Sequence, residues 1–326
     1  MEGERGAVCV TGGTGYIGSW LIMRLLELGY SVNATVRFDP ECKRDISYLT
    51  NLPGASERLQ IFNADLNEPN SFSAAIEGCT VVFHLAHPID HSESQPEEAE
   101  TKKAVEGTLG ILKACLNSKT VKRIVYTASG ATVMFNHKDQ GVTDETTWTD
   151  VDFYRSLNIR STSYLIAKTK TERAAWEFAE QHGLDLVSLI PPLVVGPFIC
   201  PNIPSSVNMA LAMILGKLEC FRGLINSNLV HVDDVASALI FLFEFPNAKG
   251  RYICCSNAMT KYELCEFLSA KYPEFQIRTA DILKIESYEV PRISSKKLLD
   301  SGFKFKYGLD EMFDGAILCA KEKGFL

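Results

Sequence analysis

The chain opens with an apolar, strand-like run that breaks into closely spaced glycines. Residues 8–18 read VCVTGGTGYIG, and an amphipathic apolar segment follows over 19–28. The pattern predicts a strand at 7–11, a tight turn and the N-terminus of a helix. Backbone N–H groups and the positive end of a helix dipole meet at such a junction, where they can hold a pyrophosphate without a dedicated cation. A dinucleotide is therefore the expected ligand, and a glycine turn that only opens a βα unit is the alternative.

The composition is that of an ordinary globular protein. Its 326 residues are 46% hydrophobic and carry a formal net charge of −7. An acidic balance argues against nucleic acid as the main partner, because no basic surface is available to neutralise phosphates. No run approaches the ~18 apolar residues of a membrane span, and the N-terminus lacks the apolar core of a signal peptide. We expect a cytoplasmic protein without membrane insertion, a monomer or weak dimer.

Ten cysteines are dispersed along the chain, and none of them forms a C-x-x-C pair. Several lie within apolar strand or helix patterns, so buried reduced thiols are expected and no metal site is predicted. Cys254 and Cys255 are adjacent. A disulfide between them is the less favoured alternative.

Strand-like and helix-like segments alternate, which is typical of a doubly wound parallel sheet. Strands are expected at 7–11, 31–36, 59–63, 81–85, 124–128 and 186–190, and helices at 71–76, 96–117 and 163–182. Five prolines within 191–206 predict a long loop, neither a regular helix nor a central strand. A helix at 207–215, a strand at 228–232, a helix at 233–243 and two or three short helices after 261 complete the prediction.

The ligand of such a sheet lies at the carboxyl ends of the strands. We expect residues 1–194 plus 225–256 to form the dinucleotide-binding Rossmann part. Residues 195–224 plus 257–326 are expected to form a smaller C-terminal substrate lobe.

Tyr164 and Lys168 lie four residues apart at the start of a predicted helix, and Ser129 ends a predicted strand. Side chains four apart project from one helix face. Reduction of a carbonyl by hydride transfer needs a phenol to protonate the alkoxide, a cation to lower the pKa of that phenol, and a hydroxyl to hold the substrate oxygen. The order glycine turn, strand-end serine, Tyr-x-x-x-Lys favours this chemistry over a chance surface pair.

Motifs along nearly the whole chain resemble those of one family. They read TGGTGYIGSWL (11–21), ADL (64–66), YTASGATV (126–133), YLIAK (164–168), PPLVVGPF (191–198), VHVDDVA (230–236) and KYGLDEMFDGAI (306–317). They are similar to those of the plant dihydroflavonol reductase family, which belongs to the extended short-chain dehydrogenases/reductases. The resemblance implies a Rossmann fold, an oxidoreductase, and Ser129, Tyr164 and Lys168 as the catalytic residues.

The resemblance also implies a cofactor site. Its predicted residues are Gly12, Gly15, Tyr16 and Ile17 along the pyrophosphate, Asp65 and Leu66 at the adenine, Leu85, Ala86 and His87 beside the cofactor, Tyr164 and Lys168 at the ribose, and Pro191, Leu193 and Val194 at the nicotinamide. Arg37 follows the second strand, where an acidic residue would instead bind the ribose of NAD. Arg37, with Arg44 as a second cation, therefore favours NADPH/NADP⁺, and a plain surface charge is the alternative.

Three positions depart from the family pattern and bear on the substrate. Met134 replaces an asparagine that resembles an anchor for flavonoid hydroxyls, which disfavours a dihydroflavonol. His87 stands where a small residue is common; it either contacts the substrate or fills space. The usual G-W-x-Y before the catalytic tyrosine reads STSY. His87, Met134 and Phe221 are the candidate substrate contacts, although each is individually also compatible with ordinary packing.

The leading hypothesis is NADPH-dependent reduction of a carbonyl or iminium on a polycyclic aromatic plant metabolite, such as an isoflavanone or an alkaloid, with Tyr164 as proton donor. Oxidation of an alcohol or hemiacetal to a ketone or lactone with NAD(P)⁺ is the alternative among enzymes. A non-catalytic NADP(H)-binding sensor or scaffold is the alternative from another class.

Overall fold

The computed structural model describes residues 5–37, 45–88, 96–136, 141–157, 162–217, 223–224, 226–284, 287–288 and 290–326. The chain forms two compact units, each assembled from separate stretches. Unit 1 comprises Met1–Ala128, Ser163–Leu189 and Ala236–Tyr252, and unit 2 comprises Ser129–Thr162, Ile190–Val235 and Ile253–Leu326. The division by ligand into a dinucleotide-binding part and a substrate lobe stays a prediction.

Unit 1 is built on a seven-stranded sheet with the strand order β11-β7-β5-β4-β1-β2-β3. Its strands are β1 (Arg5–Thr11), β2 (Tyr30–Val36), β3 (Leu59–Asn63), β4 (Val81–His84), β5 (Arg123–Thr127), β7 (Leu186–Ile190) and β11 (Gly250–Ile253). The strand pairs from β7 to β3 are all parallel. All residues of β4, β5 and β7 are buried, as expected of a sheet covered on both faces.

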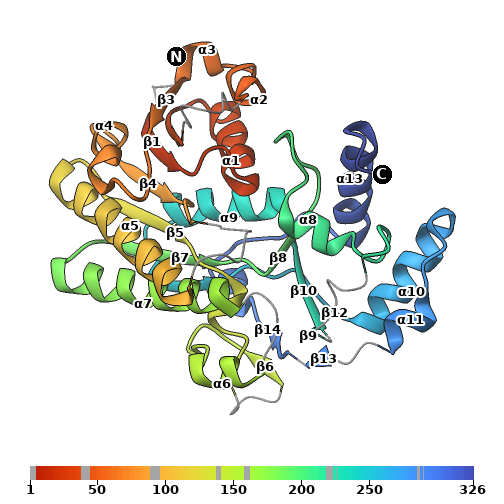
Figure 1. Ribbon diagram of the computed structural model, residues 1–326. Coiled ribbons are helices and arrows are strands. Elements are labelled where there is room, and N and C mark those ends of the chain that lie inside the picture. Colours follow the sequence, from red (N-terminus) through yellow and green to blue (C-terminus); the bar gives the residue numbers. More distant parts are fainter. Residues whose placement is uncertain are drawn as a thin grey trace. The chain divides into compact units, whose positions relative to one another are not determined.

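Side-chain contacts show which helices cover each face of this sheet. On β4, the rings of Phe83 and Phe243 of α9 (Val232–Glu244) meet edge to face, whereas His84 contacts Thr108 of α5 (Glu97–Ser118). Because neighbouring residues of a strand point to opposite faces, α9 and α5 lie on opposite sides. Trp176 of α7 (Thr162–His182) donates to Ser188 of β7. Ser188 pairs with Tyr126 of β5, and Tyr126 pairs with His84 of β4, so these three residues point to the same face of the sheet. Helix α7 therefore lies on the same side as α5. The predicted doubly wound parallel sheet is therefore confirmed (Figure 1).

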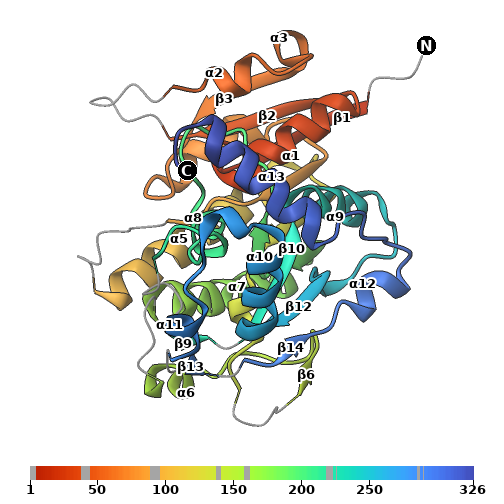
Figure 2. The same cartoon turned by 90° about the vertical axis from the view of Figure 1, so that its right-hand side faces the viewer.

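The helices of unit 1 connect these strands, and Figure 2 shows α1 beside β1 and β2. They are α1 (Tyr16–Glu27), α2 (Ser47–Thr50), α3 (Ala55–Arg58), the 3₁₀ turn η1 (Pro69–Phe72), α4 (Ser73–Ile76), α5 (Glu97–Ser118), α7 (Thr162–His182) and α9 (Val232–Glu244). Helix α1 begins three residues before the predicted start. The predicted helix at 71–76 is divided between η1 and α4, with Pro69 inside the 3₁₀ turn.

Unit 2 contains a three-stranded sheet ordered β12-β10-β8 and two small strand pairs. Its strands are β6 (Val142–Thr143), β8 (Leu193–Val195), β9 (Gly223–Leu224), β10 (Asn226–His231), β12 (Asn257–Thr260), β13 (Ser287–Tyr288) and β14 (Arg292–Ile293). Its helical segments are η2 (Gly130–Thr132), α6 (Val151–Ser156), α8 (Ser205–Ala210), α10 (Lys261–Lys271), η4 (Pro273–Phe275), α11 (Thr279–Leu283), α12 (Lys296–Asp300) and α13 (Leu309–Glu322).

Three local predictions in unit 2 were wrong. The proline-rich segment was expected to be a loop throughout, but it contains β8. This strand lies at the edge of its sheet. Prolines are tolerated beside an edge strand because they do not interrupt the hydrogen bonds between central strands. The helix expected at 207–215 ends at Ala210 and continues as turns. From residue 261 onward, the described residues form four α-helices rather than two or three, of which α10 and α13 span 11 and 14 residues.

The cysteines in the described ranges are free thiols, and all except half-buried Cys319 are buried. Adjacent Cys254 and Cys255 are among them, so the reduced state expected from the sequence agrees with the structure at these positions. Cys42 and Cys220 lie outside the described residues. Within the same ranges, no helix is long and apolar enough to span a membrane, and no cluster of acidic, histidine and cysteine side chains could hold a metal ion.

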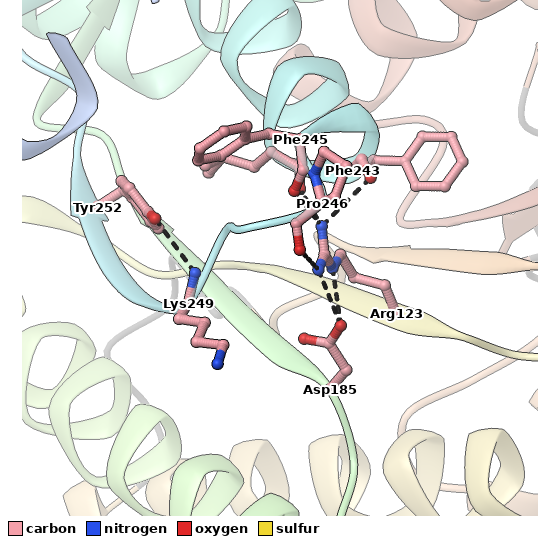
Figure 3. Close-up of polar contacts among 8 residues, drawn as sticks. Arg123, Asp185, Phe243, Phe245, Pro246, Lys249 and Tyr252 are labelled. Atoms are coloured by element: carbon pink, nitrogen blue, oxygen red, sulfur yellow. Dashed lines mark hydrogen bonds and ion pairs between the residues drawn. The ribbon is translucent and has the colours of Figure 1, made fainter. Parts of the chain in front are cut away.

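Arg123, at the amino end of β5, holds the C-terminal end of α9 against the sheet (Figure 3). Its guanidinium donates to the carbonyls of Phe245 at 2.7 Å and Leu242 at 2.9 Å, and more distantly to those of Phe243 and Pro246. Asp185 pairs with the same group, with an Nη2–Oδ2 distance of 2.9 Å. The last carbonyls of a helix lack partners within the helix, so a buried arginine satisfies several of them at once.

Substituting Arg123 by methionine is expected to lower the free energy of unfolding by about 2–4 kcal/mol, because several buried carbonyls and Asp185 lose their donor. Urea denaturation should show a lower midpoint with an unchanged slope. Lys122→Met, a change at the exposed neighbour, is the matched control and should shift stability by no more than about 0.5 kcal/mol. Equal midpoints for the two variants would refute this role of Arg123.

Candidate active site

The glycine turn after β1 is closely packed against neighbouring backbone. Gly12 has φ +73°, and a Cβ at this position would lie 3.0 Å from the backbone N and Cα of Ala86. A Cβ on Gly18 would lie 2.3 Å from the carbonyl oxygen of Gly12. Gly15 is the N-cap of α1, and no side chain caps this helix or places an acid in its first turn. The first N–H groups of α1 and its positive end therefore lie at this turn.

The hydroxyl of Thr11, the last residue of β1, joins the glycine turn to the segment after β4. Its Oγ1 accepts the N–H groups of Leu85 and Ala86, both at 3.1 Å. With both lone pairs occupied, the hydroxyl donates its only hydrogen to Nδ1 of His84, at 2.9 Å. This places Leu85 and Ala86 beside the turn, where they were predicted to meet the cofactor.

The hydrogen bonds of His84 determine its tautomer. Since Nδ1 accepts from Thr11, the ring proton is on Nε2, which donates to Thr108 of α5 at 3.1 Å. Burial, together with the charge of Lys168, lowers the pKa of His84 to about 3. His84 is therefore a neutral link between β1, β4 and α5, and it was not identified from the sequence.

Lys168 and Tyr164 are one turn apart on α7, as predicted. Lys168 is 5% exposed, and its ammonium donates to the carbonyl of Thr127, the last residue of β5, with an Nζ–O distance of 3.1 Å. It also lies over the ring of Tyr126, 5.6 Å from the centroid. Burial lowers the pKa of Lys168 to about 8, against the opposing effect of Glu172. The side chain therefore holds its positive charge at neutral pH and loses it as the pH rises through about 8.

His87 lies against the phenol of Tyr164. The two rings meet edge to face with their centroids 5.5 Å apart. Nε2 of His87 is buried and has no hydrogen-bond partner among the described residues. Burial and the charge of Lys168 lower the pKa of His87 well below its usual value, so the ring is neutral. Its predicted contact with substrate or cofactor stays a prediction, and packing against Tyr164 is what the structure shows.

Glu172 and Arg251 form a buried ion pair one further turn along α7. Glu172 is 0% exposed and Arg251, on β11, is 7% exposed. The guanidinium donates to both carboxylate oxygens, with Nε–Oε1 at 2.9 Å and Nη2–Oε2 at 3.1 Å. Two parallel charge-assisted hydrogen bonds fix the orientation of the carboxylate. The four-residue spacing from Lys168 was a sequence signal for Glu172, but nothing in the sequence indicated Arg251.

The remaining predicted residues of unit 1 lie at the ends of β2 and β3. Arg37 follows β2 and is exposed. Asp65 follows β3, and its Oδ1 accepts the N–H of Asn67 at 2.8 Å. The side chain of Leu66 packs against Gly107 of α5, where a Cβ would come within 2.9 Å of it. Arg44 lies outside the described residues.

In unit 2, Ser129 begins the chain segment directly after β5. Its Oγ accepts the N–H of Ala131 at 3.3 Å, and Gly130 donates to the carbonyl of Pro191 at 2.8 Å. Leu193 and Val194 belong to β8, with Leu193 half-buried and Val194 buried. The predicted site residues Ser129, Pro191, Leu193 and Val194 thus belong to the same unit, and the hydrogen bond from Gly130 to Pro191 joins their two segments.

Met134 lies beside Asn228, whose side-chain amide donates to the sulfur of Met134 at 3.7 Å. The amide of Asn228 also donates to the carbonyl of Pro291 at 3.1 Å and accepts the N–H of Ile293 at 3.2 Å. The amide of Asn228 thus makes these hydrogen bonds within the protein. Phe221 lies outside the described residues.

Comparisons with known proteins agree with this geometry. The model of the NAD dependent epimerase/dehydratase family matches residues 8–255. Vestitone reductase of Medicago sativa is 56% identical over 327 residues, with 100% of both chains covered. The chain belongs to the NAD-dependent epimerase/dehydratase family. The crystal structure of vestitone reductase from alfalfa superposes with a TM-score of 0.88 at 54% identity, covering 99% of this chain and 100% of that one.

Two further relatives match over similar lengths. Noscapine synthase SDR1 of Papaver somniferum is 51% identical, covering 100% of this chain and 95% of its own. Dihydroflavonol 4-reductase of Hordeum vulgare is 44% identical, covering 100% and 92%. The predicted resemblance to the dihydroflavonol reductase family is confirmed, and the protein is an oxidoreductase. The turn formed by Gly12, Gly15 and Gly18 fits the dinucleotide on which this family depends.

Proposed function

We propose that this protein uses NADPH to reduce a carbonyl or iminium group on a polycyclic aromatic plant metabolite, an isoflavanone or an alkaloid. The observation that carries the proposal is the Tyr164–Lys168 pair, with a buried ammonium held on the carbonyl at the end of β5 one helical turn from a phenol. The 56% identity to a vestitone reductase and the 51% identity to a noscapine synthase support the substrate class.

Reduction of a carbonyl leaves an alkoxide that must be protonated. The bound nicotinamide supplies the hydride. A tyrosine with its ordinary pKa of about 10 is a poor acid at neutral pH, and a nearby cation stabilises its phenolate. Lys168 is such a cation, so Tyr164 is the proposed proton donor. Oγ of Ser129 accepts the N–H of Ala131 and can still donate its hydrogen, so we assign it to hold the substrate oxygen.

Arg37 is proposed to bind the phosphate that distinguishes NADPH from NADH. Substitution by serine is expected to raise the KM for NADPH by about 10–100-fold, since a charge-assisted contact contributes roughly 1.5–3 kcal/mol. The KM for NADH should change little. Lys122→Ser removes another exposed cation from unit 1, at the amino end of β5, and is the control. An equal change for both cofactors would refute the role of Arg37.

The substrate class is tested by supplying NADPH carrying deuterium at the transferable position to the purified protein, with a panel of isoflavanones, alkaloid ketones and alkaloid iminium ions. Loss of NADPH absorbance with deuterium on the new carbinol or amine carbon is the expected result. A dihydroflavonol should react poorly, because Met134 occupies the anchor position. Tight NADPH binding without turnover of any member would contradict the proposed substrate class.

The oxidative direction is the second candidate, and the observation that favours it is the 51% identity to a noscapine synthase. The same phenol and ammonium serve both directions, since a donor of a proton in reduction accepts one in oxidation. Initial rates with alcohols and hemiacetals plus NADP⁺, compared with those of the matching ketones and lactones plus NADPH, distinguish the two directions.

A further inference from the structure

Three ionisable side chains lie along one face of α7 at intervals of four residues, namely Tyr164, Lys168 and Glu172. The proposed chemistry uses the first two. Glu172 is completely buried, which is costly for a carboxylate unless a partner compensates for the lost hydration. Arg251 supplies this compensation from β11 through two hydrogen bonds. The pair therefore fixes the Glu172 carboxylate one helical turn from Lys168.

The groups that face Lys168 explain why this charge matters. Tyr164 and Glu172 come from its own helix, Tyr126 from β5, and His84 and His87 from β4 and the segment after it. Both histidines are neutral, and burial raises the pKa of Tyr126 well above its usual value, so that phenol keeps its proton. Among these groups, Glu172 is the carboxylate, and Arg251 donates to both of its oxygens.

We propose that Glu172, oriented by Arg251, is a positioning residue that keeps Lys168 protonated and thereby sets the alkaline limit of the reaction. This inference rests on the proposed function of Tyr164 and Lys168. It is supported by the direction of the electrostatic effects, because burial lowers the pKa of Lys168 and Glu172 raises it. The carbonyl of Thr127 fixes the position of the ammonium, and Glu172 favours its charge.

Glu172→Gln keeps the size of the side chain and removes its charge. The pKa of Lys168, measured in the full chain by NMR of ¹³C-labelled lysine and assigned with Lys168→Met, is expected to fall by about one unit, the low end for loss of a nearby opposite charge. With NADPH and a reactive ketone, the alkaline limb of kcat/KM should move down by the same amount. At pH 8.5 activity should fall about tenfold, and at pH 6 it should change little.

Asp185→Asn is the matched control, because Asp185 pairs with Arg123 at the amino end of β5, whereas Lys168 contacts the carboxyl end. It should lower stability and leave both the lysine titration and the pH profile unchanged. If Glu172→Gln fails to fold because Arg251 is left unpaired, Glu172→Gln combined with Arg251→Gln removes both charges. A shift in the same direction is expected there, because Glu172 lies one helical turn from Lys168 on α7, whereas Arg251 contacts Glu172 from β11.

An unchanged pKa of Lys168 in a folded Glu172 variant would overturn the inference. If that pKa falls while the pH profile stays in place, the inference about Glu172 as the determinant of the alkaline limit also fails, and the proposed role of Lys168 fails with it. If Lys168 titrates as expected but Tyr164→Phe retains turnover, the proposed function is at fault and the electrostatic coupling stands.

Discussion

Tyr164→Phe is expected to lower kcat by about 10³-fold or more while NADPH binding persists. General acid catalysis contributes roughly 10²–10⁴-fold, and phenylalanine removes the donor while keeping the ring that meets His87 edge to face. Because the phenol acts on the reacting oxygen, the loss should appear in kcat and in kcat/KM alike. Steady-state kinetics with the reactive ketone, and NADPH titration by fluorescence, measure the two quantities.

Tyr126→Phe is the matched control for this experiment. Tyr126 also faces Lys168, but its hydroxyl is buried without a hydrogen-bond partner among the described residues. Removing an unsatisfied hydroxyl should be neutral or slightly stabilising, and the ring that lies beneath the ammonium remains. Turnover of Tyr126→Phe should stay within about twofold of the parent protein. Retained turnover in Tyr164→Phe would remove Tyr164 from the mechanism.

Gly18→Ala is expected to weaken NADPH binding by about 100-fold or more and to reduce stability. The added methyl group would lie 2.3 Å from the carbonyl oxygen of Gly12. A Cβ and a backbone oxygen are both fixed by the main chain, so no side-chain rotation can relieve the clash. The turn would have to open, which moves the N–H groups of the helix N-terminus away from the pyrophosphate position. Isothermal titration with NADPH measures the loss of affinity, and thermal denaturation without ligand measures the cost to the fold.

Gly6→Ala tests whether any alanine near β1 has this effect. Gly6 lies at the other end of the same strand, and its added Cβ would meet only the side chain of Thr80 at 3.6 Å, an ordinary contact distance. NADPH affinity should be unchanged in this variant. Equal affinity in Gly18→Ala and the parent protein would show that the turn does not bind the dinucleotide through close backbone approach.

Much of unit 1 could be predicted from the sequence because its signals are local. Each strand of the parallel sheet is a short apolar run, and the glycines at 12, 15 and 18 mark the strand-to-helix turn. Tyr164 and Lys168 share a helix face because of their spacing alone. Unit 2 was predicted less well. Its short strands pair with distant segments, such as β8 with β10, and prolines around Leu193–Val195 concealed an edge strand.

The sequence by itself determined the class of fold, the glycine turn and the order of the proposed catalytic residues, since each depends on neighbours within a few positions. Only the tertiary structure decided which buried polar groups meet. Thr11, His84 and Thr108 come together from β1, β4 and α5, and Glu172 meets Arg251 from 79 positions away. Such partners are selected by how buried segments pack, because a buried polar group must find a partner wherever the fold provides one.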